Sequence, residues 1–215
     1  MKVTLYKVNP ISGGAETELY TEISDGDNFE RNKFTVSAEM FFELGFSVNL
    51  TGEKEISREK YSEIMSFAEK NSAVKKGISI LSFGDNTKKN LARKLVLKGF
   101  SKDSAEYACD FLSEAGYINE SESAKLLAMD MANKKLYGAK RIAASLFEKG
   151  FSKEAIDYAA SEIDVDFSEI CRKRIERMGG VKIFFDKEAG KKHVASLLRY
   201  GFLYDDIKQA IKRKI

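Results

Sequence analysis

Few side chains in this chain could catalyse a reaction at neutral pH. Its one histidine, His193, could act as a general acid or base, because imidazole titrates close to neutral pH, and it stands three residues before Ser196. In two related stretches described below, the corresponding residues are Leu91 and Ile142. Because an aliphatic residue occupies this position in both related stretches, we expect His193 to be a packed or half-exposed histidine rather than a catalytic base.

The two cysteines, Cys109 and Cys171, lie far apart and match no metal-ligand spacing. We expect reduced, partly buried thiols rather than a disulfide or a zinc site. The sequence also contains no phosphate-binding glycine-rich loop with its lysine, no His-Glu-x-x-His, no Cys-x-x-Cys and no nucleophile elbow. We therefore predict a protein that is not an enzyme and that holds no cofactor or metal.

Basic residues around one aromatic residue are the remaining chemical signal. The stretch 134–142 places four cations around Tyr137 and Gly138, at an expected helix–helix corner. Arginine binds carboxylates and phosphates through paired hydrogen bonds, so charge alone does not separate a protein partner from a nucleic acid. A solvated corner with Ile142 buried and Tyr137 packed is the alternative. The predicted partner-binding residues are Lys135, Tyr137, Lys140, Arg141, Arg172, Arg174, Arg177, Lys191, Lys192 and Arg199.

The charge is divided unevenly along the chain. Residues 1–72 hold 8 Lys and Arg against 13 Asp and Glu, a net charge of −5. Residues 73–215 hold the other 28 basic residues against 20 acidic ones, a net charge of +8. Such an asymmetry suggests that the second part meets an acidic partner, although basic helices are often only solvated faces.

An internal repeat should position these basic residues. The stretch 98–101 (Lys-Gly-Phe-Ser) returns at 149–152 and, more loosely, at 200–203, so that Gly99, Gly150 and Gly201 are spaced 51 residues apart. A glycine after an apolar helical run typically ends the helix with a left-handed backbone, and a serine two residues later can cap the next helix. We expect the three glycines to share this backbone role.

The repeat predicts a mainly α fold: three tandem three-helix repeats that form an elongated, curved helical array, preceded by a small β-containing module. Since a single unit cannot bury its apolar stripe alone, consecutive units must stack. The expected divisions are an acidic N-terminal α/β module at 1–72 and helical repeats at 73–121, 122–165 and 166–215.

Alternation and capping signals give the elements at the two ends of the chain. We expect strands at 2–8, 16–23 and 28–36, and helices at 37–44, 57–70, 74–83 and 204–214.

No stretch approaches the ~18 consecutive apolar residues of a membrane span, and no apolar run follows basic residues at the N-terminus. We expect a cytoplasmic, monomeric protein that does not bind membranes.

Three motifs resemble the RecX regulatory proteins of bacteria: 98–101, then 116–120 (Gly-Tyr-Ile-Asn-Glu) with Ala124, and 137–142 leading to 149–151. The similarity covers roughly residue 73 to the end. The resemblance implies three tandem three-helix repeats without catalytic residues. It also implies a regulator that binds in the groove of the RecA–DNA filament.

The same resemblance implies that the chain inhibits or modulates the recombinase, ATPase and co-protease activities of RecA in recombination, DNA repair and the SOS response. DNA inside the filament is a possible further contact. The alternative is a helical module that binds single- or double-stranded DNA directly through its basic face. Salt dependence separates the two, because neutralising phosphates makes affinity fall steeply with salt.

Overall fold

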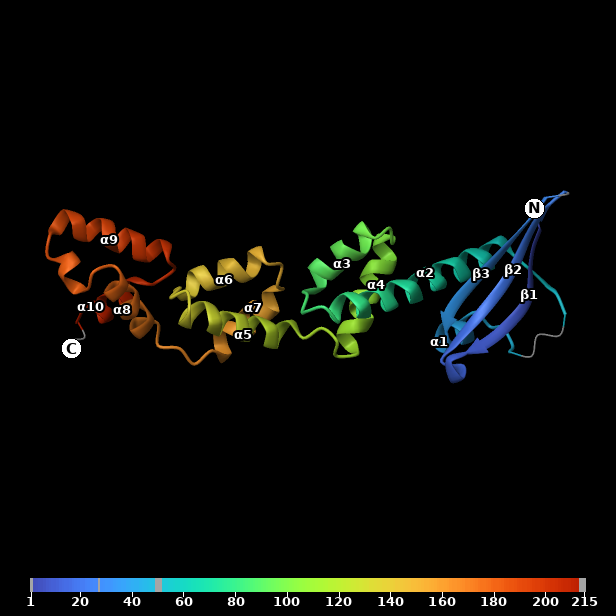
Figure 1. Cartoon of the computed structure of the whole chain (residues 1–215), viewed down its shortest axis with the longest axis horizontal. Coiled ribbons are helices and arrows are strands. Elements are labelled where there is room, and N and C mark those ends of the chain that lie inside the picture. Colours follow the sequence, from blue (N-terminus) through green and yellow to red (C-terminus); the bar gives the residue numbers. More distant parts are fainter. Residues whose placement is uncertain (1, 27, 49–51, 213–215) are drawn as a thin grey trace. The chain divides into compact units, whose positions relative to one another are not determined.

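The computed structural model describes residues 2–26, 28–48 and 52–212 of the chain. This part is mainly helical, with helices α1 to α10 and a small N-terminal antiparallel sheet (Figure 1), which confirms the prediction of a mainly α fold with an N-terminal β-containing part. The chain divides into two compact units. The first unit contains residues 1–84 and 91–117, and the second contains residues 85–90 and 118–215.

Four strands form the sheet of the first unit in the order β3-β2-β1-β4. They are β1 (Lys2–Ile11), β2 (Glu16–Asp25), β3 (Asn28–Ser37) and β4 (Lys54–Ile56). The first three were predicted, but β1 runs on through Pro10. Proline is tolerated there because β4 pairs only with Val3 to Leu5, so this end of β1 has β2 as its one strand neighbour within the described sheet. The sequence analysis missed β4, which is three residues long.

One face of the sheet is apolar and packs against helices. Alternate residues such as Leu5 and Leu19 are fully buried, because successive strand residues point to opposite faces. They meet α1 (Ala38–Glu43), the predicted helix capped by Ser37, and α2 (Arg58–Leu81). The buried members of this core are Val3, Leu5, Leu19, Val36, Met40, Phe41, Leu44, Ile56, Ile64 and Ala68.

The prediction of two helices at 57–70 and 74–83 is wrong, because α2 runs through both without a break. Asn71 lies between the two expected helices, where the sequence predicts a break, and its side chain is buried, with 9% exposed. Its amide donates hydrogen bonds to Glu16 Oε1 at 2.9 Å and to the backbone oxygen of Thr35 at 3.1 Å. Asn71 thus ties the middle of α2 to the sheet, and α2 is continuous across residues 72 and 73, where we expected a domain boundary.

Two further helices follow, α3 (Lys88–Leu97) and α4 (Lys102–Glu114), and α4 packs against α2. Ser101 caps α4 by accepting a hydrogen bond from the Ser104 backbone. Glu69 of α2 holds this cap in place: its carboxylate accepts hydrogen bonds from Ser101 N at 2.8 Å, Ser101 Oγ at 2.7 Å and Ser104 Oγ at 2.7 Å.

The second unit continues with six helices. They are α5 (Glu120–Asn133), α6 (Ala139–Glu148), α7 (Lys153–Glu162), α8 (Phe167–Arg177), α9 (Lys187–Arg199) and α10 (Tyr204–Lys212). Helix α7 packs against α5 and α10 against α8. One apolar cluster joins α5, α6 and α7, and another joins α8, α9 and α10. The expected end of the last helix at 213–214 lies outside the described residues.

The three repeated glycines have the same backbone conformation, which confirms that expectation. Their φ angles are +95° at Gly99, +87° at Gly150 and +90° at Gly201.

A hydrogen bond from a helix-capping serine also recurs at the spacing of 51 residues. Glu69 accepts it from Ser101 N, and Glu120 accepts it from Ser152 N at 3.0 Å. The next positions in this series are Cys171 and Leu203, which cannot form that bond.

We expect alanine to be tolerated unequally at two of these glycines. At Gly150 an added Cβ would lie 3.3 Å from the Thr87 hydroxyl oxygen, a tight contact without backbone overlap, so Gly150→Ala should destabilise the protein by ~1–2 kcal/mol, mainly through positive φ. At Gly201 the Cβ would overlap the backbone of Arg141, which should add a further ~1–3 kcal/mol. Urea unfolding followed by circular dichroism measures both, and equal losses would refute the difference.

The Glu69 contact should make stability depend on pH. Burial acts to raise the pKa of Glu69, but the hydrogen bonds from Ser101 and Ser104 outweigh it and hold the pKa below its usual value. Because the unfolded carboxyl titrates near pH ~4.3, the contact stabilises the fold fully above that value. The stabilisation is lost as pH falls through the lower folded pKa.

Glu69→Gln should therefore be less stable than the parent near neutral pH, and the gap should close in acid. Urea unfolding over a pH series measures the gap. Glu106→Gln on α4 is the control, since Glu106 is exposed. A gap that is the same at all pH values would contradict this role of Glu69.

Candidate partner-binding site

Two tyrosines far apart in the sequence meet in the second unit. Tyr137 lies at the corner between α5 and α6, and Tyr200 lies at the end of α9. Their ring centroids are 6.1 Å apart with an interplanar angle of 47°. This is within the range in which aromatic rings attract each other.

A backbone contact between two glycines brings these tyrosines together. The Gly138 N–H donates to the Tyr200 carbonyl oxygen at 2.8 Å, and the Lys140 N–H donates to the Gly201 carbonyl oxygen at 3.1 Å. A Cβ on Gly138 would overlap the Gly201 backbone. Glycine is therefore required on both sides of the contact.

The corner is also held by Leu136, which precedes Tyr137. Leu136 has a φ of +52°, unusual for a residue with a side chain, and is only 1% exposed. Its side chain belongs to the apolar cluster formed by α8, α9 and α10. Burial of a leucine contributes about 1.5–3 kcal/mol, which is enough to balance the ~1–2 kcal/mol of the left-handed backbone. The strain is thus offset locally.

Three cations lie over the two rings. Lys135 Nζ is 5.9 Å and Arg141 Cζ is 5.8 Å from the centroid of Tyr137. Arg174 Cζ, from α8, is 3.6 Å from the centroid of Tyr200. Cations within about 6 Å of a ring centroid are attracted by its π face. We call these five residues, Lys135, Tyr137, Arg141, Arg174 and Tyr200, the basic–aromatic cluster.

The members of the cluster differ in exposure. Lys135 and Arg141 are exposed, as is the predicted residue Lys140 beside them. Arg174 is half-buried, and its Nε is buried with no hydrogen-bond partner in the described part of the chain. Its guanidinium is fixed by stacking, so it supports Tyr200 and is a poor site for a surface mutation.

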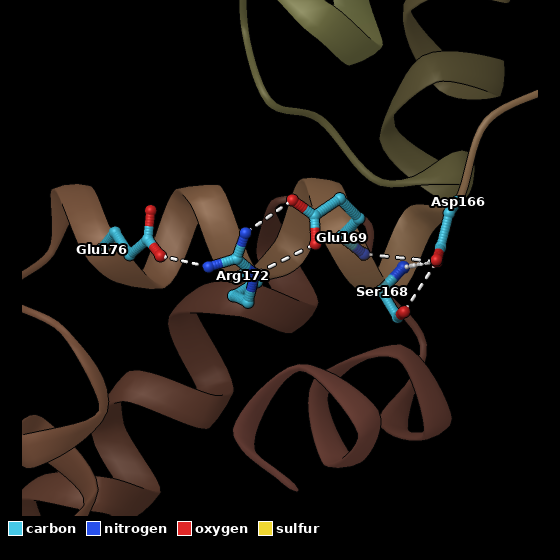
Figure 2. A network of polar contacts seen from close by, with 5 residues as sticks. All are labelled: Asp166, Ser168, Glu169, Arg172 and Glu176. Atoms are coloured by element: carbon cyan, nitrogen blue, oxygen red, sulfur yellow. Dashed lines mark hydrogen bonds and ion pairs between the residues drawn. The ribbon is translucent and has the colours of Figure 1, made fainter. Parts of the chain in front are cut away.

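Arg172, two residues before Arg174, is engaged along its own helix (Figure 2). Its guanidinium donates two hydrogen bonds to Glu169, at 3.0 and 2.7 Å, and a third to Glu176 at 2.6 Å. The same helix is capped by Asp166, which accepts hydrogen bonds from the Ser168 and Glu169 backbone. The charge of Arg172 is therefore balanced within α8, and no described contact joins this residue to the basic–aromatic cluster.

The other predicted residues are exposed on α8 and α9, away from any described contact with the cluster. Lys191 forms an ion pair with Glu188 at 2.7 Å. Arg177, Lys192 and Arg199 form no ion pair or side-chain hydrogen bond with the residues that the structure describes. Of the ten predicted residues, the structure joins Lys135, Tyr137, Arg141 and Arg174 through ring contacts and places Lys140 next to them.

Comparison with known proteins gives the family. Over 188 residues the chain is 30% identical to Regulatory protein RecX of Clostridioides difficile (strain 630), with 85% of each chain covered. The chain belongs to the RecX family of regulatory proteins. Regulatory protein RecX of Caldanaerobacter subterraneus subsp. tengcongensis is 29% identical over 184 residues, covering 83% of this chain and 86% of that one. No family model matches the sequence.

Two solved RecX structures share the fold. The crystal structure of a regulatory protein RecX matches with a TM-score of 0.68 at 17% identity, over 99% of this chain and all of that one. RecX from Lactobacillus salivarius matches with a TM-score of 0.60 at 22% identity, over 67% of this chain and 95% of that one. At these identities the likeness establishes the fold, and the first match includes the N-terminal sheet.

Sequence reasoning missed Tyr200 as part of the basic–aromatic cluster. The signal was present in the repeat, since the residue before the repeated glycine is Lys98 or Lys149 in the first two copies and Tyr200 in the third. A tyrosine in place of two lysines would have pointed to a changed contact at that turn. The need for glycine at position 138 was not foreseen either.

The side chains considered for catalysis are packed. His193 is half-buried, with its ring edge-on to Phe184 at a centroid distance of 6.0 Å, as expected of a structural histidine. Cys109 and Cys171 form no disulfide with a described residue and are buried rather than partly buried. Burial, and then the charge of Asp206, raises the pKa of Cys171 to about 12, so this thiol stays protonated.

Within the described residues, no helix is long and apolar enough to cross a membrane.

Proposed function

We propose that this RecX-family chain is a non-enzymatic regulator that binds the RecA–DNA filament. It inhibits or modulates the recombinase, ATPase and co-protease activities of RecA, in the cytoplasm, during DNA repair and the SOS response. Family membership supports the regulatory role. The observation that carries the docking site is the basic–aromatic cluster, which gathers residues of the α5–α6 corner, of α6, of α8 and of the turn after α9 at one place.

The electrostatics of this corner suit a negatively charged filament. Lys135, Lys140 and Arg141 are exposed and form no ion pair with any described residue, so three positive charges are free at one helix corner. Charge complementarity of this kind raises the rate of encounter and is screened by salt. The tyrosine rings add apolar area at the centre, as is common in binding sites. The chain acts as a monomer in this proposal.

The helical part is proposed to be three tandem three-helix repeats, at 73–121, 122–165 and 166–215, after an N-terminal module at 1–72. Since α2 runs from Arg58 to Leu81, the first helix of the first repeat is then only the C-terminal part of α2, residues 73–81. Support comes from the recurring glycine turns, from the matching Glu69 and Glu120 contacts, and from the packing of α4 on α2, α7 on α5 and α10 on α8.

Direct binding to DNA is the second candidate, and one observation favours it. Tyrosine rings set among cations are the usual means of binding single strands, since bases stack on the rings while cations contact phosphates. The basic–aromatic cluster has both parts. A DNA contact within the filament is also compatible with the first candidate.

The variant Lys135→Glu/Arg141→Glu tests the proposed docking site. Because both side chains are exposed, the change should alter stability by only ~0–1 kcal/mol. It should weaken inhibition of the DNA-dependent ATPase activity of RecA by ~10-fold or more, as each close charge contact contributes roughly 1 kcal/mol and each reversal adds repulsion. The matched control is Lys153→Glu/Lys173→Glu, which reverses two exposed charges outside the cluster.

Three outcomes are decisive. If the folded cluster variant inhibits as well as the parent, the cluster is not the docking surface. If the parent leaves the ATPase and strand-exchange activities of RecA unchanged at saturating concentration, the proposed target is wrong. Tight binding of the parent to naked single-stranded DNA, with affinity falling steeply as salt rises, would favour the second candidate.

A further inference from the structure

The first compact unit contains a cavity of about 240 Å³ that the proposed function does not use. Its lining comes from α1, α2 and α4 and includes Glu39, Met40, Asn71, Val74, Tyr107 and Phe111. Cavities that hold whole small-molecule ligands are usually about 300–1,000 Å³. This cavity is smaller than that, and its volume suits a single large side chain of a partner protein.

Two aromatic rings form a flat wall of this cavity. Tyr107 and Phe111, one turn apart on α4, are stacked with centroids 6.4 Å apart and an interplanar angle of 18°. Phe111 remains 41% exposed. One face of the Tyr107 ring already carries a cation, since Lys70 Nζ lies 5.3 Å from its centroid and is balanced by Asp103 at 3.1 Å.

The charges around the cavity are negative. Glu39 lines it, and together with Glu43 and Glu114 it helps, after burial, to raise the pKa of Tyr107. All three carboxylates are exposed and form no ion pair with the residues that the structure describes. By contrast, acidic residues on the sheet are paired with cations: Glu16 with Lys75, Glu18 with Lys33 and Glu22 with Arg31.

We propose that this cavity binds an arginine side chain of a partner protein. A guanidinium is planar and stacks on aromatic faces, and its N–H groups can donate to a carboxylate such as that of Glu39. Apolar residues beside the arginine would cover Phe111 and Met40. This surface is acidic and lies in the first unit, so it is separate in chemistry from the basic–aromatic cluster of the second unit.

The test uses the full chain and a blocked peptide of sequence Gly-Leu-Arg-Leu-Gly. Binding is followed by NMR shifts of the aromatic resonances of Tyr107 and Phe111. A peptide with citrulline, which has the shape of arginine without its charge, should bind at least ~10-fold more weakly, because it loses the charge-assisted hydrogen bonds. A lysine peptide should also bind more weakly, since ammonium does not stack.

Exposed glutamates allow matched variants that should fold normally. Glu39→Gln/Glu114→Gln should weaken binding of the arginine peptide by roughly fivefold, an effect that salt screens. Glu106→Gln, an exposed glutamate on the same helix as Glu114, should change affinity by less than about twofold. The proposal is overturned if the citrulline or lysine peptide binds as well, if both variants behave alike, or if the shifts leave Tyr107 and Phe111 unchanged.

Discussion

The approach of Gly138 to the Tyr200–Gly201 turn is the contact on which the candidate site depends. Two backbone hydrogen bonds, each between one N–H and one carbonyl oxygen, join the start of α6 to the end of α9. Backbone atoms can meet this closely only because neither glycine carries a Cβ. With the backbones fixed, the flanking residues Tyr137 and Tyr200 lie next to each other. Arg141 and Arg174 then lie close enough to contact the ring faces.

The turn at Lys149 and Gly150, 51 residues before Tyr200 and Gly201, makes a looser version of the same contact. Thr87 takes the place of Gly138 there, and the joining hydrogen bond comes from the Asn90 side chain, which donates to the Lys149 carbonyl oxygen at 2.8 Å. A side-chain bond spans a wider gap than a backbone bond, so Gly150 has room that Gly201 lacks. The same repeat geometry therefore gives a solvated lysine at one turn and a packed aromatic pair at the next.

Much of the fold could be predicted from sequence, because its signals are local: glycines at helix ends, serine and asparagine caps, and alternation in the three long strands. The misses have long-range causes. Asn71 resembles a helix break until its partners on the sheet are known, and β4 is too short to show a pattern. In the site, composition identified Lys135, Tyr137 and Arg141. Only tertiary contacts reveal that Tyr200 belongs with them and that Arg174 is stacked.

Counting charges along the chain overstates how much charge a partner can meet. In the basic part, Arg172, Lys134 and Lys191 are each balanced by a carboxylate three or four residues away. Exposed pairs of this kind contribute little to stability, but they remove a charge from the surface field. Lys135, Lys140 and Arg141 have no such partner. The same is true of Arg177 and Arg199, but Lys135, Lys140 and Arg141 lie together at one corner, where helical spacing offers them no carboxylate. It is this local lack of acidic neighbours, more than the net charge of residues 73–215, on which the proposal of an anionic partner at this corner rests.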